Sequence, residues 1–303
     1  MGYLEFFYDF SKLHFYLQGS FLHSIFASLI IISLNKDKMK RIMILVLFSL
    51  NMHANAQDRL FTYTYQSNVL EKSQKELEIW TSMFNSREHF YRGFEHRIEF
   101  EVGLGKKLQT AFYLNSEYNA FIELHDTIEI LHHESEFSFS NEWKYKLSDP
   151  VANAFGSALY FEYTLAPAET ELELKFIIDK QSGKFLNAFN VEGEMEFEKE
   201  FEEEGNEIEV ETEIEYKLNL FYGLAYNLSK NLSVGFELKN SNKFEDGELE
   251  YSILNAGPCF SWNTEGFWLN FSFMPQLTNL IDFNPELSHN EKFQSRLIFS
   301  YVF

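Results

Sequence analysis

Carboxylates at alternate positions are the side chains in this sequence with the clearest capacity for chemistry. The 303 residues include 46 Asp and Glu against 25 Lys and Arg, which gives a formal net charge of −21 at pH 7. Many glutamates fall in three runs, at 169–173, 192–202 and 207–215, where most alternate with apolar or small residues. Carboxylates crowded in this way repel one another unless cations or water lie between them. These runs therefore indicate cation binding or cation passage.

The composition excludes several other functions. Sequence-independent binding of nucleic acid requires Lys and Arg against phosphate, so a chain this acidic is not expected to bind DNA or RNA. The single cysteine, Cys259, excludes a disulfide framework and a Cys-rich metal cluster, and we interpret it as a packing residue. With 45% hydrophobic residues, 34 Phe and 16 Tyr, the chain is too apolar to be a disordered acidic protein. A folded domain must hold the carboxylates in place.

The elements that position these carboxylates are strands, because the side chains alternate with a period of two. In residues 208–226 the even positions are mostly apolar, while the odd positions up to 219 are Glu, Lys or Asn. A helix does not have this period. The same pattern along the chain predicts strands at residues 76–85, 90–104, 108–124, 130–147, 154–166, 169–180, 184–201, 207–227, 232–240, 249–262, 266–276 and 292–303.

These strands predict an all-β fold, a transmembrane antiparallel up-and-down β-barrel of about 12 strands, with roughly 10–14 allowed. An even number of strands with short turns at one side is typical of an outer-membrane barrel that has both termini in the periplasm. A soluble β-sandwich alternates similarly, but its strands usually have only five or six residues. The connection 277–291 contains Leu277, Leu280, Ile281 and Phe283, and is either an ordinary external loop or a lid over the lumen.

The C-terminal strand carries a family resemblance. Phe303, Tyr301, Phe299 and Leu297 alternate with other residues up to the last position. This pattern resembles the terminal strand of bacterial outer-membrane β-barrel proteins, which typically end in Phe with Tyr two residues before it. The resemblance implies an outer-membrane location and recognition of Phe299, Tyr301 and Phe303 by the barrel-assembly machinery, with outer-membrane lipid and lipopolysaccharide around the barrel.

The beginning of the chain resembles an export signal. Lys40 and Arg41 form a positive region, residues 42–50 are apolar, and 54–56 form an A-x-A cleavage site. We therefore expect four segments: a miscalled N-terminal extension at 1–38, a signal peptide at 39–56, a periplasmic lead-in or extra strand at 57–75, and the barrel at 76–303. An uncleaved anchor helix before residue 39 is the alternative to the miscalled start.

If apolar positions face lipid, the alternating glutamates face the lumen. The predicted acidic wall consists of Glu169, Glu171, Glu173, Glu192, Glu194, Glu196, Glu198, Glu200, Glu202, Glu207, Glu209, Glu211, Glu213 and Glu215. Arg97 and Arg296 are expected on the opposite side. Because acidic rings favour cations, we expect a cation-preferring lumen. Alternatively, the glutamates are polar filler of a hydrated barrel, with divalent cations bound among them and no other cofactor.

One constellation points to an enzyme instead. His133 and Ser135 have the H-x-S spacing of outer-membrane phospholipase A, and this similarity implies a lipid hydrolase that acts at the outer surface. That family continues with Asn-Gly, whereas Glu136 and Phe137 follow here. His125, His132, His133 and Glu134 also form a weak metal-binding cluster, more simply read as solvated loop residues, so no metal site is assigned.

The sequence thus favours a passive channel or transporter for small solutes. The alternatives are a lipid hydrolase that uses His133 and Ser135, and a barrel with a structural role that does not conduct. No energy-coupling motif or separate plug domain precedes the barrel, so active uptake is not expected.

Overall fold

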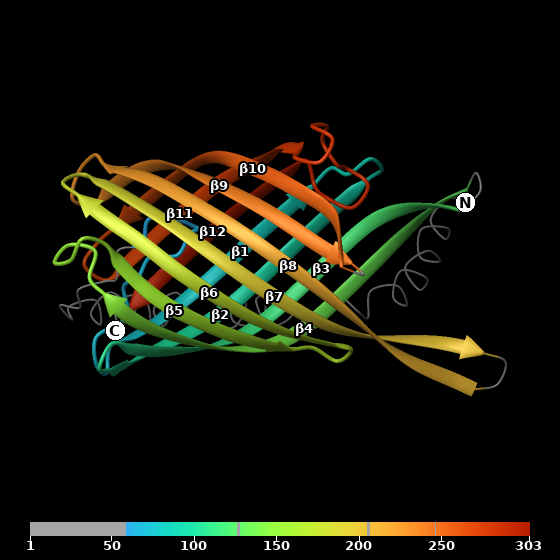
Figure 1. Ribbon diagram of the computed structural model, residues 1–303, viewed down its shortest axis with the longest axis horizontal. Coiled ribbons are helices and arrows are strands. Elements are labelled where there is room, and N and C mark those ends of the chain that lie inside the picture. The colour runs from blue at the N-terminus through green and yellow to red at the C-terminus, as the bar shows by residue number, and fades with distance from the viewer. Residues whose placement is uncertain (1–58, 126–127, 205–206, 246) are drawn as a thin grey trace, which may run out of the picture. The chain divides into compact units, whose positions relative to one another are not determined.

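The computed structural model describes residues 59–125, 128–204, 207–245 and 247–303, which form twelve strands (Figure 1). The strands are β1 (Lys75–Asn85), β2 (Tyr91–Gly105), β3 (Leu108–His125), β4 (Ile128–Ser148), β5 (Gly156–Leu165), β6 (Glu169–Ser182), β7 (Phe185–Glu204), β8 (Glu207–Asn227), β9 (Leu232–Glu245), β10 (Glu248–Asn263), β11 (Phe267–Asn279) and β12 (Phe293–Val302). Each pairs with its sequence neighbours and β1 pairs with β12, all antiparallel, so the sheet closes into a barrel. The predicted up-and-down β-barrel is confirmed.

The outer face of the barrel is apolar. Leu114, Phe137, Leu174 and Val210 are each more than half exposed, and similar side chains occur at alternate positions on the other strands. Polar side chains at the intervening positions are buried, among them Glu99, Glu142 and Glu237. This is the inverse of a water-soluble protein and matches the lipid-facing and lumen-facing alternation of membrane barrels. None of the described residues forms a helix of the length and apolar character needed to cross a membrane.

The barrel closes where the C-terminal strand meets β1. The Lys75 amide donates to the Phe303 carbonyl at 3.1 Å, and the Phe303 amide donates to the Lys75 carbonyl at 2.8 Å. Leu297 and Phe299 face outward with about two fifths of their surface exposed, while Ile298 is buried. The period-two pattern predicted for this strand is therefore present. We call this end of the barrel, where β1 begins and β12 ends, the terminus end, and the other the hairpin end.

The β7–β8 hairpin projects from the hairpin end (Figure 1). Pairing of β6 with β7 reaches Glu198, and pairing of β8 with β9 starts at Tyr216. Among the described strands, residues 199–204 of β7 and 207–212 of β8 therefore pair only with each other. This part of the hairpin is a two-stranded ribbon and not part of the closed wall.

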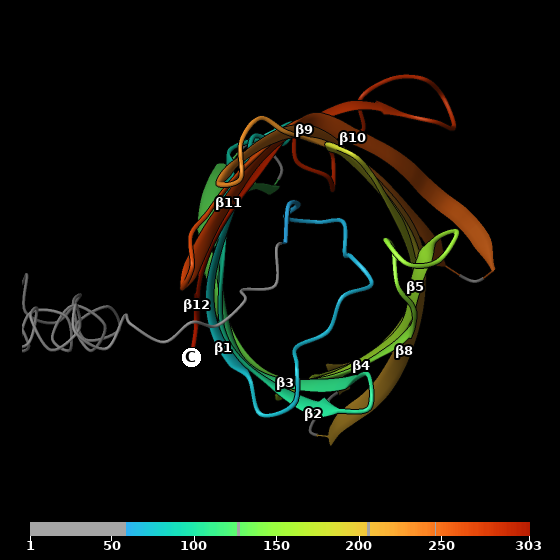
Figure 2. The same ribbon diagram turned by 90° about the vertical axis from the view of Figure 1, so that its left-hand side faces the viewer.

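A chain segment runs through the inside of the barrel (Figure 2). Residues 59–70 contain no strand, and all but two of them are buried. The expected roles of residues 57–75, a periplasmic lead-in or an extra strand, are both wrong for this segment, because side chains of the barrel wall take up its backbone hydrogen bonds. We call residues 59–70 the plug segment.

The loop near the C-terminus is not a lid. β11 extends to Asn279, and the loop that follows exposes its apolar side chains to the outside. Leu280, Ile281 and Phe283 are 39%, 48% and 76% exposed, and Leu277 at the end of β11 is 52% exposed. The interpretation of 277–291 as a lid therefore does not hold. The predicted signal peptide at 39–56 and the extension at 1–38 lie outside the described residues.

Candidate functional site

A polar hollow lies in the lumen on the hairpin side of the plug segment. This vestibule has a volume of about 310 Å³, and Tyr63 and Tyr65 of the plug segment line it. Its charged lining consists of Glu95, Glu117, Glu136, Glu169, Glu171, Glu173, Glu192 and Glu194, with Arg97, Lys175, Lys239 and Arg296. Eight carboxylates against four basic side chains leave the cavity acidic. A positively charged solute would be stabilised there.

The predicted acidic wall is present in part. Glu169, Glu171, Glu173, Glu192 and Glu194 line the vestibule as expected. Among the remainder, Glu196 and Glu215 are partly buried and paired with lysines. Glu198 is exposed, and Glu213, opposite it on β8, is partly buried.

The remaining predicted wall residues fall on the projecting ribbon. These are Glu200, Glu202, Glu207, Glu209 and Glu211, whose side chains lie outside the described residues. The backbone there pairs beyond the closed barrel, so the acidic wall of the lumen is shorter than the sequence indicated.

Lysines break up the wall. The sequence has lysine among its alternating polar positions, but the predicted wall did not include it. Lys175 Nζ lies 3.0 Å from Glu173 and 2.7 Å from Glu192, and Lys217 Nζ lies 2.9 Å from Glu194 and 2.5 Å from Glu196. Lys243 forms a third such centre at 2.6 Å from Glu215. Each lysine has the inward parity of the glutamates on its strand, so the alternation itself was the available signal. The wall is therefore a set of ion pairs with a surplus of carboxylates.

The two predicted lumen arginines also line the vestibule. Arg97 Nη2 contacts Glu162 at 3.0 Å, and its guanidinium lies 4.8 Å from the ring centre of Tyr113. Arg296 Nη2 lies 3.6 Å from Glu95, and its guanidinium lies 4.3 Å from the ring centre of Tyr63. Arg296 therefore connects β12 with the plug segment, a contact that the strand pattern alone did not indicate.

Glu237 on β9 anchors the plug segment. Its carboxylate is fully buried and accepts hydrogen bonds from the amides of Thr62, Tyr63 and Thr64 at 2.9–3.1 Å. The hydroxyls of Thr62 and Ser272 also donate to it, at 3.1 and 2.5 Å. A buried carboxylate that accepts several bonds holds its donors firmly, because any donor left without a partner would be costly.

Other strands hold the rest of the plug segment. The amide of Asn190 on β7 pairs with both the N–H and the carbonyl of Tyr65, at 2.6 and 2.9 Å. Asp179 on β6 accepts from the amide and the hydroxyl of Ser67, at 3.2 and 2.5 Å. Gln109 on β3 accepts from the Leu70 amide at 2.9 Å. The anchors lie on opposite sides of the barrel, so the segment crosses the lumen.

Apolar contacts complete the fit of the plug segment. Leu60 and Phe61 pack against Leu186, Ala188, Ala225 and Cys259, which confirms a packing environment for the cysteine. Tyr65 packs beside Trp80 and Tyr160. Small residues leave space for these rings: a Cβ atom at Gly223 would lie 2.7 Å from the ring of Phe61.

The plug segment separates two cavities. A second hollow of about 310 Å³ lies on its other side, lined by Leu60, Gln66 and Asn68 together with Asp179 and residues of the terminus end. The two cavities share no lining residue. In this conformation the plug segment therefore lies between the two cavities.

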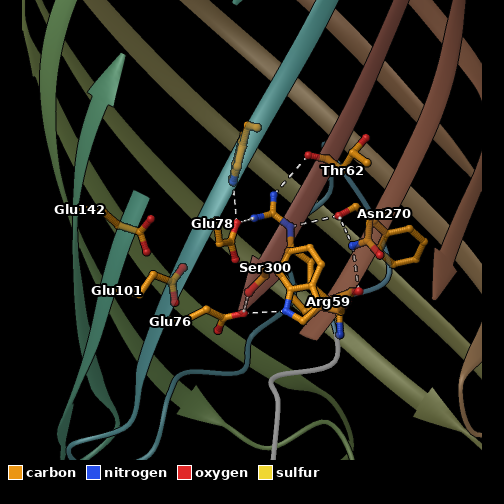
Figure 3. A network of polar contacts seen from close by, with 12 residues as sticks. Arg59, Thr62, Glu76, Glu78, Glu101, Glu142, Asn270 and Ser300 are labelled. Atoms are coloured by element: carbon orange, nitrogen blue, oxygen red, sulfur yellow. Dashed lines mark hydrogen bonds and ion pairs between the residues drawn. The ribbon is translucent and has the colours of Figure 1, made fainter. Parts of the chain in front are cut away.

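At its N-terminal part the segment is held by Arg59 (Figure 3). The guanidinium donates to the carbonyls of Phe61 and Thr62 at 3.0 and 3.2 Å and lies 3.6 Å from Glu78. The guanidinium also stacks over two aromatic rings, 4.4 Å from the ring centre of Tyr65 and 4.5 Å from that of Trp80. A cation stacked in this way is positioned by both charge and packing.

The enzyme constellation is not assembled. His133 and Ser135 both lie on the outward face of β4 and are exposed, as predicted. The Nδ1 atom of His133 bonds the Tyr118 hydroxyl at 2.7 Å. Side chains two residues apart on one strand stand roughly 7 Å from each other, which is beyond hydrogen-bond reach. His132 contacts Glu123 at 3.1 Å instead of gathering with His133.

Together, the closed antiparallel barrel, its apolar outer face and its polar lumen define an outer-membrane β-barrel protein. The β-domain of the Bordetella autotransporter Brka has the same kind of fold, with a TM-score of 0.51 at 10% identity over 77% of this chain and 100% of that one. The translocator domain of the autotransporter NalP from Neisseria meningitidis matches with a TM-score of 0.48 at 11% identity, over 88% and 97% of the two chains. The KdgM porin in complex with disordered oligogalacturonate gives 0.44 at 10% identity, over 75% and 98%.

The chain belongs to a protein family of unknown function, DUF6662, whose model matches residues 53–303. A comparison with the sequences of curated proteins gives no match. The match to the family includes the plug segment together with the whole barrel. What the protein does must therefore be argued from the lumen.

Proposed function

We propose that this protein is a passive outer-membrane channel for small solutes, that it prefers cations, and that the plug segment closes it until displaced. The observation that carries the proposal is the acidic vestibule on one side of the plug segment. A barrel built only as a scaffold has no need of a hollow lined by twelve charged side chains. Burying charge is costly unless the charges meet partners or water, so such a lining fits a hydrated route.

The cation preference follows from the charge surplus. Arg97, Lys175 and Arg296 each lie beside a glutamate, and the carboxylates outnumber the basic side chains two to one in the vestibule. Glu117 and Glu136 lie opposite each other in the register of β3 and β4, near the hairpin end. An acidic entrance raises the local concentration of cations and lowers that of anions.

Closure follows from the plug segment, which is continuous with β1 and not a separate domain. Its anchors are hydrogen bonds and packed rings, each of which can be broken without disturbing the strand pairing. Displacement of residues 59–70 towards the terminus end would join the two cavities. The same anchors favour a second candidate function, a structural barrel that does not conduct, if the segment never leaves the lumen.

Reversal potentials in planar bilayers test the proposal. A variant that lacks residues 59–70 should conduct in a salt gradient, with a reversal potential on the cation side. Glu171→Gln and Glu194→Gln in that background should move the potential towards zero, while Thr212→Gln on the outer face of the ribbon should leave it unchanged. Heat-dependent mobility in gels, a general property of folded barrels, verifies folding. A folded deletion variant without conductance would reject the channel, and anion selectivity would reject the cation preference.

The lipid hydrolase inferred from His133 and Ser135 requires a separate assay. Fatty-acid release from phospholipid micelles that is lost in Ser135→Ala would establish it. The contact between His133 and Tyr118 gives that reading no structural support.

A further inference from the structure

Five buried glutamates lie together at the terminus end, apart from the vestibule lining. They are Glu76 and Glu78 on β1, Glu99 and Glu101 on β2, and Glu142 on β4, each at most 4% exposed. The register places Glu76 opposite Glu101 and Glu78 opposite Glu99. Glu101 and Glu142 flank Ala111, whose small side chain lets them approach each other. Figure 3 shows the Glu142 and Glu101 carboxylates turned towards each other.

The basic side chains nearby are too few for this cluster. Arg59 lies 3.6 Å from Glu78, and Lys144 is buried on the same face of β4 as Glu142. Against five carboxylates, these two leave a formal surplus of three negative charges. Like charges placed directly opposite one another on neighbouring strands are destabilising, and burial increases the cost.

Hydrogen bonds satisfy only some of the carboxylate oxygens. Trp80 Nε1 donates to Glu78 and Trp268 Nε1 donates to Glu76, both at 2.6 Å. Gln109 donates to Glu101 at 2.8 Å, and the Tyr113 hydroxyl donates to Glu142. One oxygen each of Glu76, Glu99 and Glu142 is buried without a hydrogen-bond partner among the described residues. Oxygens from three strands therefore lack a positive partner.

The acidic triad in the vestibule provides a contrast. Glu171, Glu173 and Glu194 are equally close to one another, but Lys175 and Lys217 lie 3.0 and 2.9 Å from two of them. In the buried cluster, one oxygen from each of Glu78, Glu99 and Glu101 lies within 4.8 Å of the others, without a lysine in contact. Two lysines thus contact the vestibule triad at 2.9–3.0 Å, whereas the buried triad has, among the described residues, only the more distant Arg59, 3.6 Å from Glu78.

We propose that Glu78, Glu99 and Glu101 bind a hard divalent cation of the calcium class, with Glu142 facing the ion from β4. Ca²⁺ takes carboxylate oxygens at about 2.3–2.6 Å, so oxygens that share one ion lie at most about 5 Å apart, as these do. The ion would bridge β1 and β2, next to the pairing of β1 with β12 and close to Arg59. It thereby relieves the repulsion between paired glutamates, whether or not the barrel conducts.

Terbium luminescence tests this site. Tb³⁺ replaces Ca²⁺ at oxygen sites and emits when a nearby tryptophan is excited, and the indoles of Trp80 and Trp268 bond directly to the cluster. Barrel protein refolded in detergent without divalent ions should show sensitised emission that saturates near one Tb³⁺ per chain. Ca²⁺ should displace this Tb³⁺, and metal analysis after refolding in Ca²⁺ should give one Ca²⁺ per chain.

Variants locate the ion. Glu99→Gln and Glu101→Gln keep the side-chain size and should weaken Tb³⁺ binding roughly tenfold or more, whereas Glu171→Gln in the vestibule triad should not. Trp143→Phe, which removes an outward-facing indole, should leave the emission unchanged. The proposal is overturned if no Tb³⁺ emission appears, if Glu171→Gln alone abolishes it, or if folded Glu99→Gln binds as well as the parent. Absence of Tb³⁺ emission would mean that the carboxyl groups of the cluster share protons instead of binding an ion.

Discussion

At the scale of single residues, the carboxylate that anchors the plug segment in the lumen does not belong to the conspicuous acidic runs. Glu237 accepts hydrogen bonds from three consecutive backbone amides and two hydroxyls, and it lies outside the three acidic runs. The parity of β9 places it inside, because Phe236 faces outward with 42% of its surface exposed. Nothing in the sequence identifies its partners in the plug segment, which lie about 175 residues earlier.

Replacing Glu237 should release the plug segment. Glu237→Gln introduces an NH₂ donor facing the amides of Tyr63 and Thr64, so buried donors lose an acceptor. Bonds to charged groups contribute about 1.5–3 kcal/mol, which predicts roughly a tenfold to hundredfold rise in opening. Labelling of Thr64→Cys by a water-soluble maleimide, in a Cys259→Ala background, measures that opening.

Two controls accompany this labelling. Glu162→Gln also neutralises a buried carboxylate, but its partners are Arg97 and Tyr160, so the labelling rate should stay near that of the parent. Equal labelling of the Glu237→Gln variant and the parent would contradict the anchoring role of Glu237.

A loop carboxylate gives a pH-dependent prediction. A hydrogen bond from Lys146, with others from the amides of Ala152 and Val151, holds the pKa of Asp149 below its usual value. A lowered folded-state pKa contributes stability that is present above the unfolded pKa and lost as pH falls through the folded one. The melting temperature of Asp149→Asn should therefore lie below that of the parent at pH 6, and the gap should narrow below about pH 4. A gap that widens in acid would contradict this assignment.

At the scale of elements, period-two alternation was sufficient to predict the strands. Several bounds agree to within a residue, such as 207–227 for β8 and 108–124 for β3. The residues that follow 240 were not expected in β9, which runs to Glu245 because its backbone continues to pair with β10 to that residue and with β8 to Phe244. Alternation is a local property, so it identifies strands but not what the lumen contains.

The plug segment could not be predicted in the same way. Residues 61–65 alternate aromatic and Thr residues, as a strand would, but the chain bends at residues 62–64. Its backbone bonds go to side chains on β7 and β9 instead of to a neighbouring strand. Such side-chain partners depend on closure of the barrel, which brings together residues distant in sequence.

Replacing a glycine on β8 should reveal how tightly the plug segment fits inside the barrel. In Gly223→Val the added side chain would collide with the ring of Phe61. Overpacking costs about 1–3 kcal/mol, which predicts roughly a fivefold to hundredfold increase in plug opening. Gly193→Val on β7 is the matched control, because a Cβ there meets no atom within 4 Å. We expect higher open probability in bilayers for the first variant only. Equal open probabilities would show that Phe61 does not seal the lumen.

At the scale of the whole molecule, the negative charge lies in three separate places. The composition showed only an acidic chain, while the barrel divides its glutamates among the vestibule, the projecting ribbon and the buried cluster at the terminus end. Export stays a prediction, because the predicted signal peptide lies outside the described residues. Cation preference stays a prediction that requires a measurement of ion selectivity. The barrel itself was predictable, because lipid outside and water inside impose alternation on every strand.

A reversible lock on the plug segment is the decisive experiment. Ser67 Oγ donates to Asp179 Oδ1 at 2.5 Å. Ser67→Cys with Asp179→Cys, in a Cys259→Ala background, should therefore form a disulfide that fixes the plug segment to β6. One bilayer recording before and after addition of a reductant compares both states of the same protein. The account predicts silence when oxidised and cation-selective conductance after reduction. The same conductance in both states, or anion selectivity after reduction, would contradict it.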